Sequence, residues 1–197
     1  RGADIAPTPV VGVIGVIDSL AAPPPGMAFS LGEHVVTLGT TLPEFGGSEW
    51  AYVVHGIDGG SPPVADLEAA RYLHGLIRDL VSRRVVSAVH DVSDGGYGVA
   101  LAEMAIAGGV GASLMPEDEQ SHAAWCFSES ASRIVVTVPP EKLSEVLTAA
   151  ADAKVVARDC GTTGGTRLIV NGVFDVAVSD LATTWRSAVP LALGVNE

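Results

Sequence analysis

The chain alternates short runs rich in valine and isoleucine with segments whose apolar residues recur every three or four positions. Runs of β-branched residues predict strands, because such side chains favour an extended backbone. The three-and-four spacing predicts helices with one apolar face. The predicted strands are residues 7–17, 34–39, 85–89, 110–114, 134–138, 155–158, 166–170 and 173–178. The predicted helices are residues 49–54, 66–84, 97–108, 139–153 and 180–188.

The order of these elements predicts the fold class. Strands that alternate with helices favour layers in which helices cover a sheet. Asn171-Gly172 between two strands is a strong hairpin signal, so at least one strand pair is antiparallel. We therefore expect an α+β fold, a layered α/β arrangement with a mixed β-sheet covered by helices. In the helix at 66–84 the expected apolar stripe is Leu67, Ala70, His74, Ile77 and Val81.

A proline-rich stretch divides the first thirty residues from the rest. Pro23-Pro24-Pro25-Gly26 interrupts the pattern, and residues 19–29 are predicted to be a linker. Residues 1–18 are expected to be the trailing strand of a preceding domain, or to pair with this one, because a lone strand is not stable. Residues 30–197 form the main domain. The chain opens with Arg1 and has no signal segment, so we expect a piece of a longer protein.

Composition narrows the range of functions. Hydrophobic residues make up 48% of the 197 residues, which is enough for a real core. The net charge of -12 argues against nucleic acid and anionic membrane surfaces as partners. The mean hydropathy is +0.38, yet no apolar run approaches the roughly 20 residues that span a bilayer. Two cysteines, Cys126 in a predicted core segment and Cys160 at a predicted strand end, make no disulfide framework, so a cytoplasmic location is expected.

The strongest candidate for chemistry is the turn from His90 to Gly96, between a predicted strand and a predicted helix. Its glycines, Gly95 and Gly96, would let the backbone approach a phosphate at a helix N-terminus. Asp91 and Asp94 could hold Mg²⁺, which often bridges carboxylates and phosphate. A purely structural interpretation, in which Ser93 or Asp94 caps the helix and the glycines make the turn, is the one that spacing favours. Both interpretations stay open at this point.

Two further acidic residues stand near predicted element starts. Glu49 follows a plausible cap, Ser48, and is either a ligand or a first-turn acid favoured by the helix dipole. Glu129 lies in a polar loop that also contains Arg133. The simplest interpretation of Glu129 and Arg133 is a surface ion pair that contributes little stability.

Five motifs in order resemble the C-terminal part of the phosphoribosylformylglycinamidine synthase family, in the aminoimidazole ribonucleotide synthetase-like superfamily. They cover nearly the whole chain and are residues 7–12 (PTPVVG), 46–50 (GGSEW), 90–96 (HDVSDGG), 127–130 (FSES) with Arg133, and 161–185. The resemblance implies a fold like the C-terminal domain of aminoimidazole ribonucleotide synthetase. This chain is most similar to the C-terminal domain of the second of two fused units.

The resemblance implies an ATP-dependent ligase of purine biosynthesis. With ATP and Mg²⁺ the family converts formylglycinamide ribonucleotide and glutamine-derived ammonia to the amidine, releasing ADP and phosphate. The implied partners are the N-terminal domains of the same polypeptide, a glutaminase subunit and a small bridging subunit. Because the main ATP ligands belong to the N-terminal domains, the fragment is expected to be inactive. Its pseudo-site or nucleotide-pocket residues would be Glu49, Asp91, Asp94, Gly95, Gly96, Glu129 and Ser130.

Two alternatives remain at this stage. Related enzymes, such as selenophosphate synthetase, thiamine-monophosphate kinase and the hydrogenase-maturation dehydratase, use the same domain with different turn sequences. The motif at residues 46–50 favours the purine enzyme over these. The other alternative is a non-catalytic scaffold domain that packs on partner domains, with or without a held nucleotide.

Overall fold

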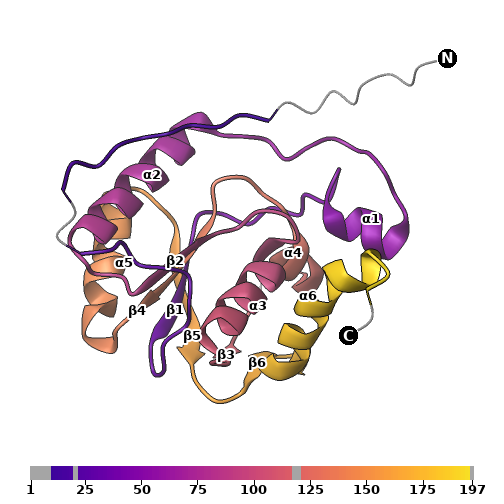
Figure 1. The fold of residues 1–197 in the computed structure, drawn as a ribbon. Coiled ribbons are helices and arrows are strands. Elements are labelled where there is room, and N and C mark those ends of the chain that lie inside the picture. Colours follow the sequence, from indigo (N-terminus) through magenta and orange to yellow (C-terminus); the bar gives the residue numbers. More distant parts are fainter. Residues whose placement is uncertain (1–9, 20–21, 117–120, 196–197) are drawn as a thin grey trace.

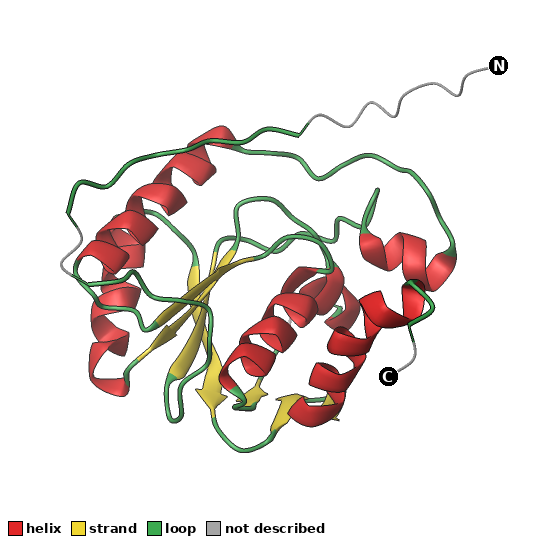
Figure 2. Ribbon diagram, viewed as in Figure 1, coloured by secondary structure: helices red, strands yellow, loops and turns green. Residues whose placement is uncertain are grey.

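A mixed sheet forms the middle layer of the molecule (Figures 1 and 2). The computed structural model describes residues 10–19, 22–116 and 121–195, and within them the sheet has seven strands in the order β2-β4-β1-β5-β3-β6-β7. Neighbouring strands are antiparallel except β3 and β6, which run parallel. The predicted mixed sheet is therefore confirmed. The strands are β1 (His34–Leu38), β2 (Ala88–Asp91), β3 (Ala112–Leu114), β4 (Ile134–Val138), β5 (Ala157–Thr163), β6 (Arg167–Val170) and β7 (Phe174–Ala177).

Helices cover both faces of this sheet (Figure 1). One face carries α2 (Leu67–Ser82) and α5 (Leu143–Asp152), and a short 3-10 turn, η1 (Pro140–Lys142), leads into α5. The other face carries α3 (Gly96–Gly108), α4 (His122–Phe127) and α6 (Val178–Ala192). The short α1 (Glu49–His55) lies at one end, away from the sheet. Within the described ranges, no helix combines the length and apolarity needed to cross a bilayer.

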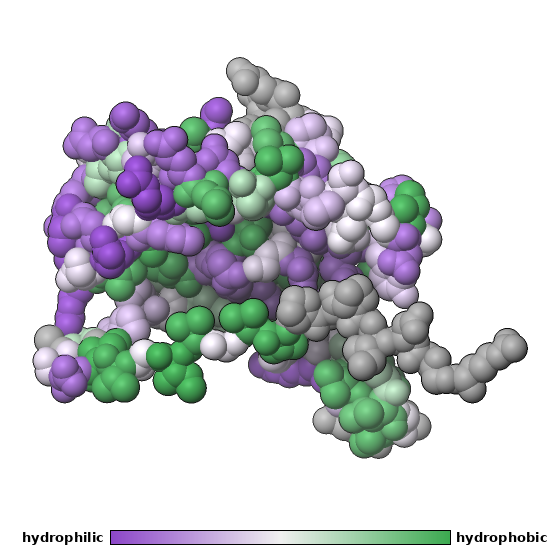
Figure 3. Space-filling view, turned by 90° about the horizontal axis from the view of Figure 1, so that it is seen from above, coloured by the Kyte–Doolittle hydropathy of each residue, from purple (hydrophilic) through white to green (hydrophobic). Residues whose placement is uncertain are grey.

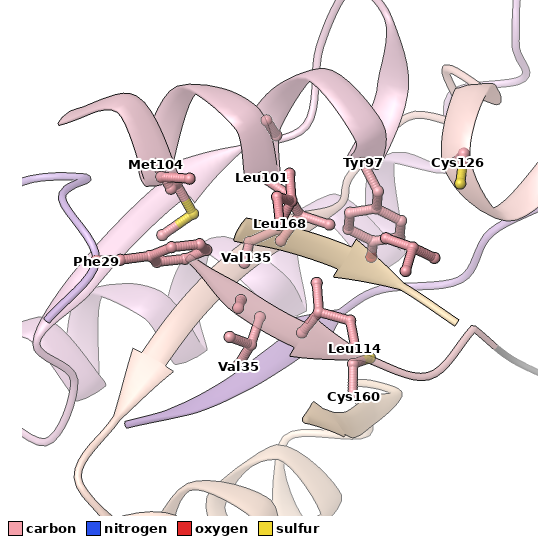
Figure 4. Close-up of a cluster of buried hydrophobic side chains, with 14 of the residues drawn as sticks. Phe29, Val35, Tyr97, Leu101, Met104, Leu114, Cys126, Val135, Cys160 and Leu168 are labelled. Atoms are coloured by element: carbon pink, nitrogen blue, oxygen red, sulfur yellow. The ribbon is translucent and has the colours of Figure 1, made fainter. Parts of the chain in front are cut away.

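The larger core lies between α3 and the sheet. Tyr97, Leu101 and Met104 point from α3 toward Val35 of β1 and Leu168 of β6, and all five side chains are at most 1% exposed (Figure 4). A helix that is apolar on nearly every side is a buried helix. The helix after the glycine turn is thus the central helix of the domain, and the turn is held at the edge of a rigid core.

On the opposite face the predicted stripe of α2 is only partly confirmed, since Ile77 and Val81 pack against the core but other members do not. The side chains that face the sheet are Leu73, Leu76 and Leu80, which are at most 4% exposed. Leu67 is 79% exposed and His74 also faces solvent. The predicted stripe and the stripe of three leucines are neighbours on the helix surface. The helix turns its leucine stripe toward the sheet because this buries more apolar surface.

Several boundaries differ from the sequence prediction. β2 begins at Ala88 and includes His90 and Asp91, because these residues pair with β4. β5 extends to Thr163, beyond the predicted end at residue 158, so Cys160 lies in mid-strand, 5% exposed, and not at a strand end. α4 was not predicted, and it places Cys126 in the core as expected, at 0% exposed.

The N-terminal segment does not form the predicted strand in its described part. Residues 10–17 have no strand conformation, and their six valine and isoleucine side chains are 71% to 96% exposed. Figure 3 shows them as a row of hydrophobic residues that stands off from the body. Residues 1–9 of the predicted strand and residues 20–21 of the predicted linker lie outside the described residues. The end of the linker packs firmly, since Gly26 O accepts a hydrogen bond from Val89 N (2.9 Å) and Phe29 is 2% exposed.

Arg133 is a buried cation, so the predicted surface ion pair is wrong. Its side chain is 2% exposed, and its guanidinium donates to Ser130 O (2.9 Å), Thr41 Oγ1 (3.2 Å) and Ser128 O (2.5 Å). The guanidinium carbon also lies 4.6 Å from the ring centroid of Tyr97. Burial lowers the pKa of Arg133, but an arginine remains charged at neutral pH. One side chain thereby ties the 128–130 loop to the loop after β1 and to α3.

We expect Arg133→Lys to lower the free energy of unfolding by about 2–4 kcal/mol. An ammonium cannot reach three acceptors arranged for a planar guanidinium, so buried oxygens lose their partners. Urea unfolding followed by circular dichroism measures the change. The matched control is Arg167→Lys, which alters an exposed pair with Asp175 and should cost less than about 1 kcal/mol. Equal costs for the two variants would show that Arg133 has no special structural role.

Gly96 is a second position at which the fold tolerates no other residue. Its φ is +68°, and an added Cβ would lie 2.5 Å from Ser128 O and 2.7 Å from Cys126 O. We expect Gly96→Ala to cost about 3–4 kcal/mol, combining a left-handed backbone with overpacking. Gly109→Ala is the control, because Gly109 has φ +63° and open space around it, and it should cost only about 1–2 kcal/mol. Thermal unfolding measures both variants. Gly109→Ala gives the cost of the left-handed backbone alone, and the extra cost of Gly96→Ala is the cost of overpacking.

Candidate functional site

The glycine-containing turn is built differently from the structural interpretation of the sequence. Gly95, with φ +80°, is the N-cap of α3, and no side chain of its own caps the helix. Neither Ser93 nor Asp94 is the cap, so that prediction is wrong. Ser93 instead donates its hydroxyl proton to Asp91 Oδ2. The left-handed glycine turns the chain so that its amide points toward a different loop.

That loop supplies the carboxylate of Glu129. Glu129 Oε1 accepts hydrogen bonds from Gly95 N (2.8 Å) and from Glu49 N (2.9 Å). Both amides lie at helix starts, where the helix dipole favours negative charge. Glu129 therefore occupies the place at which a phosphate would meet the turn. Three residues predicted for the site, Glu49, Gly95 and Glu129, are brought together although 80 and 34 residues separate them in sequence.

Asp91 and Asp94 lie at the surface beside this bridge. The side chain of Asp91 is 72% exposed, and the hydrogen bond from Ser93 lowers its pKa, with help from His90. His90 Nε2 lies 3.1 Å from Glu103 Oε2 on α3, so the end of β2 is linked to the central helix. Asp94 is also exposed. Both carboxylates are therefore available to solvent.

We tested whether these aspartates fit Mg²⁺. No group of three or more histidine, cysteine, aspartate or glutamate side chains suited to a metal occurs among the residues that the structure describes. Mg²⁺ is commonly held by one or two carboxylates together with phosphates and waters. Two exposed carboxylates fit such an ion only when a phosphate-bearing ligand supplies the remaining oxygens.

Ser130 and Gly96 make contacts that hold the loop in place. Ser130 is 2% exposed, and its hydroxyl oxygen accepts from Leu42 N (3.0 Å) and lies 3.0 Å from Ser128 Oγ. Gly96 lies against the backbone of residues 126–128. Together these contacts fix the loop that carries Glu129.

A cleft of about 210 Å³ lies on the other side of the same loop. It is enclosed by the N-terminal half of α2, the loop after β1 and the loops before β4 and β5. Of the predicted site residues only Ser130 lines it, whereas Glu49, Asp91, Asp94 and Glu129 do not. Glu49, Gly95 and Glu129 therefore form a bridge between two helix starts, and the cleft shares only Ser130 with the predicted site residues.

Sequence reasoning missed the contacts that place α1 at the site. Trp50 stacks on Phe127, with ring centroids 4.2 Å apart and an interplanar angle of 14°. The Ser48 hydroxyl accepts from Ala51 N, which confirms the predicted cap. Trp50 belongs to the motif at residues 46–50 and Phe127 to the motif at residues 127–130, but no local pattern predicts that the two rings are in contact. Cys126 is fully buried, and burial raises its pKa to about 12, which disfavours the reactive thiolate.

Solved structures with a similar fold include PurL of Thermotoga maritima complexed with FGAR, at a TM-score of 0.69 and 22% identity, covering 80% of this chain and 29% of that chain. Hydrogenase maturation protein HypE is also similar, at a TM-score of 0.54 and 15% identity, covering 81% of this chain and 52% of that one. These likenesses establish the fold alone.

Curated relatives cover almost all of this chain. The phosphoribosylformylglycinamidine synthase subunit PurL of a Nocardioides species is 44% identical over 96% of this chain and 25% of its own length. The corresponding subunit of Moorella thermoacetica is 37% identical over 96% of this chain and 26% of its own. The chain thus spans about a quarter of the length of these relatives. A family model described as AIR synthase related protein, C-terminal domain, matches residues 31–171, and the chain belongs to this family.

Proposed function

We propose that this chain is the C-terminal domain of the second half of a phosphoribosylformylglycinamidine synthase. The observation that carries the proposal is the 44% identity over 96% of the chain to a relative that bears this name. The order of the five motifs supports the same assignment. The curated relatives at 44% and 37% identity both bear the synthase name, which favours it over the other enzymes of the superfamily.

The whole polypeptide would convert formylglycinamide ribonucleotide, ATP and ammonia to the amidine, ADP and phosphate. ATP supplies the phosphoryl group that turns the formamide oxygen into a leaving group. The ammonia would come from a glutaminase subunit through a small bridging subunit, in the cytoplasm. A solved PurLQS structure from Thermotoga maritima, similar in fold to this chain, supports partners of this kind.

Within that enzyme the present domain would form a pseudo-site. Glu129 holds the two amides that would otherwise meet phosphate. Asp91 and Asp94 would support Mg²⁺ only beside a nucleotide held mainly by the rest of the polypeptide. The arrangement therefore favours a structural role over a catalytic role for this domain.

The proposed domain limits assign residues 1–18 to the preceding ATP-handling domain, residues 19–29 to a linker and residues 30–197 to this domain. The exposure of residues 10–17 supports the first limit, because six apolar side chains have no partner within the part of the chain that is described. The packing of Gly26 and Phe29 places the end of the linker against the body of the domain.

We expect no turnover by this chain alone when formylglycinamide ribonucleotide, ATP and ammonia are supplied, and turnover when the polypeptide also carries the upstream domains. The physical reason is that the main ATP ligands are expected in the upstream domains, while in this domain Glu129 already binds the amides of Glu49 and Gly95. A coupled assay measures ADP release by each of the two polypeptides, and mass spectrometry detects the amidine. An inactive longer polypeptide would overturn the proposed function, and product formation by this chain alone would overturn the pseudo-site.

We also expect ADP with Mg²⁺ to bind this chain more weakly than about 1 mM, because an internal carboxylate already satisfies the two helix-start amides. Isothermal titration calorimetry tests this. Asp91→Asn is the matched variant, since it removes one exposed charge and should leave the titration unchanged. Tight binding that Asp91→Asn abolishes would mean that the turn is a true nucleotide site.

A further inference from the structure

α1 exposes more apolar surface than its place in this domain explains. Of its seven residues only Ala51 is buried. Tyr52, Val53 and Val54 are 59%, 72% and 51% exposed, and Ile57 just beyond the helix is 57% exposed. Contiguous exposed apolar residues mark interaction sites more often than scattered ones do.

Local stability does not account for these residues. A helix of seven residues is too short to be stable in water by itself, and valine is a poor helix former. α1 is held by the Trp50–Phe127 stack and by Glu129, which engage only its inner side and its first amide. Polar residues at positions 52–54 would satisfy those contacts equally well. The contacts of α1 among the described residues therefore do not explain why its outer side is apolar.

We propose that Tyr52, Val53, Val54 and Ile57, here called the α1 surface, form the docking surface for the ATP-handling part of the same synthase polypeptide. This rests on the proposed function. The chain spans about a quarter of its relatives' length, so most of such a polypeptide lies outside this domain. The four side chains of the α1 surface are uncharged and the exposed carboxylates of Glu49 and Asp58 lie beside them, a mixture that fits a protein surface with an apolar centre and does not fit a polyanion. Residues 10–17 expose apolar side chains as well, as expected where this domain joins the next.

Docking at the α1 surface would change the geometry of the glycine turn. The first amide of α1 and the amide of Gly95 share one oxygen of Glu129, so a shift of α1 changes the geometry at the start of α3. Glu129 is in this sense a positioning residue between the interface and the turn. The stack of Trp50 on Phe127 transmits the same shift to the end of α4.

Hydrogen–deuterium exchange tests the docking surface, with this chain compared to the polypeptide that includes its upstream domains. We expect amides 50–57 to exchange at least about tenfold more slowly in the longer polypeptide, which corresponds to about 1.4 kcal/mol. Val53→Glu should return them to the rates of the isolated chain, because burying a carboxylate in an apolar interface is costly. Leu67→Glu is the matched control, since Leu67 is 79% exposed on α2, and it should leave the protection intact.

Three results would overturn the proposal. The first is equal exchange of α1 in the two polypeptides, and the second is an equal effect of Val53→Glu and Leu67→Glu. The third is protection of α1 in the isolated chain that grows with its concentration, which would identify a second copy as the occupant. The turnover assay separates this from the proposed function. An active synthase with an unprotected α1 refutes docking alone, and a protected α1 in an inactive polypeptide refutes the function alone.

Discussion

The carboxylate of Glu129 is the interaction on which the site depends. It accepts the first amides of two helical segments that come from distant parts of the chain, and it supplies the negative charge that both helix starts favour. A phosphate at a glycine-containing turn is bound by the same two effects. The turn therefore keeps the geometry of an anion site while a protein side chain serves as the anion.

Holding Glu129 in this position requires a rigid loop, and Arg133 provides it. The guanidinium binds the carbonyls of Ser128 and Ser130 from inside the core, so the loop that presents an anion on one side is fixed by a cation on the other. Gly96 completes the arrangement, because only a residue without a side chain can lie so close to the 126–128 backbone. The conspicuous glycines of the sequence are thus explained by packing before any ligand is considered.

The sequence predicted most of what local periodicity controls, although the strand at 7–17 and part of the α2 stripe are wrong, and it missed what distant contacts control. The sheet, its covering helices, the hairpin at Asn171-Gly172 and the caps Ser48 and Asp66 follow from short-range patterns, and the structure confirms them. The capping of Gly95 depends on a residue 34 positions away, so no local rule finds it. Arg133 looked like a surface charge because its burial depends on carbonyls and an aromatic ring brought in by folding.

Some parts of this domain find all their contacts inside it, and other parts expose side chains that only another surface could cover. Every buried polar group of the Glu129 loop discussed above has a partner inside the domain, and that part of the structure is complete. The outer side of α1 and residues 10–17 are the opposite case, with apolar side chains that nothing described here covers. Hydrophobic burial is the main favourable term in folding, so apolar residues retained at such positions contribute stability only when another surface removes them from water. The core of the domain is covered by its own elements, whereas apolar side chains stay uncovered in two separate places, on α1 and along residues 10–17, and α1 is the one that adjoins the Glu129 loop.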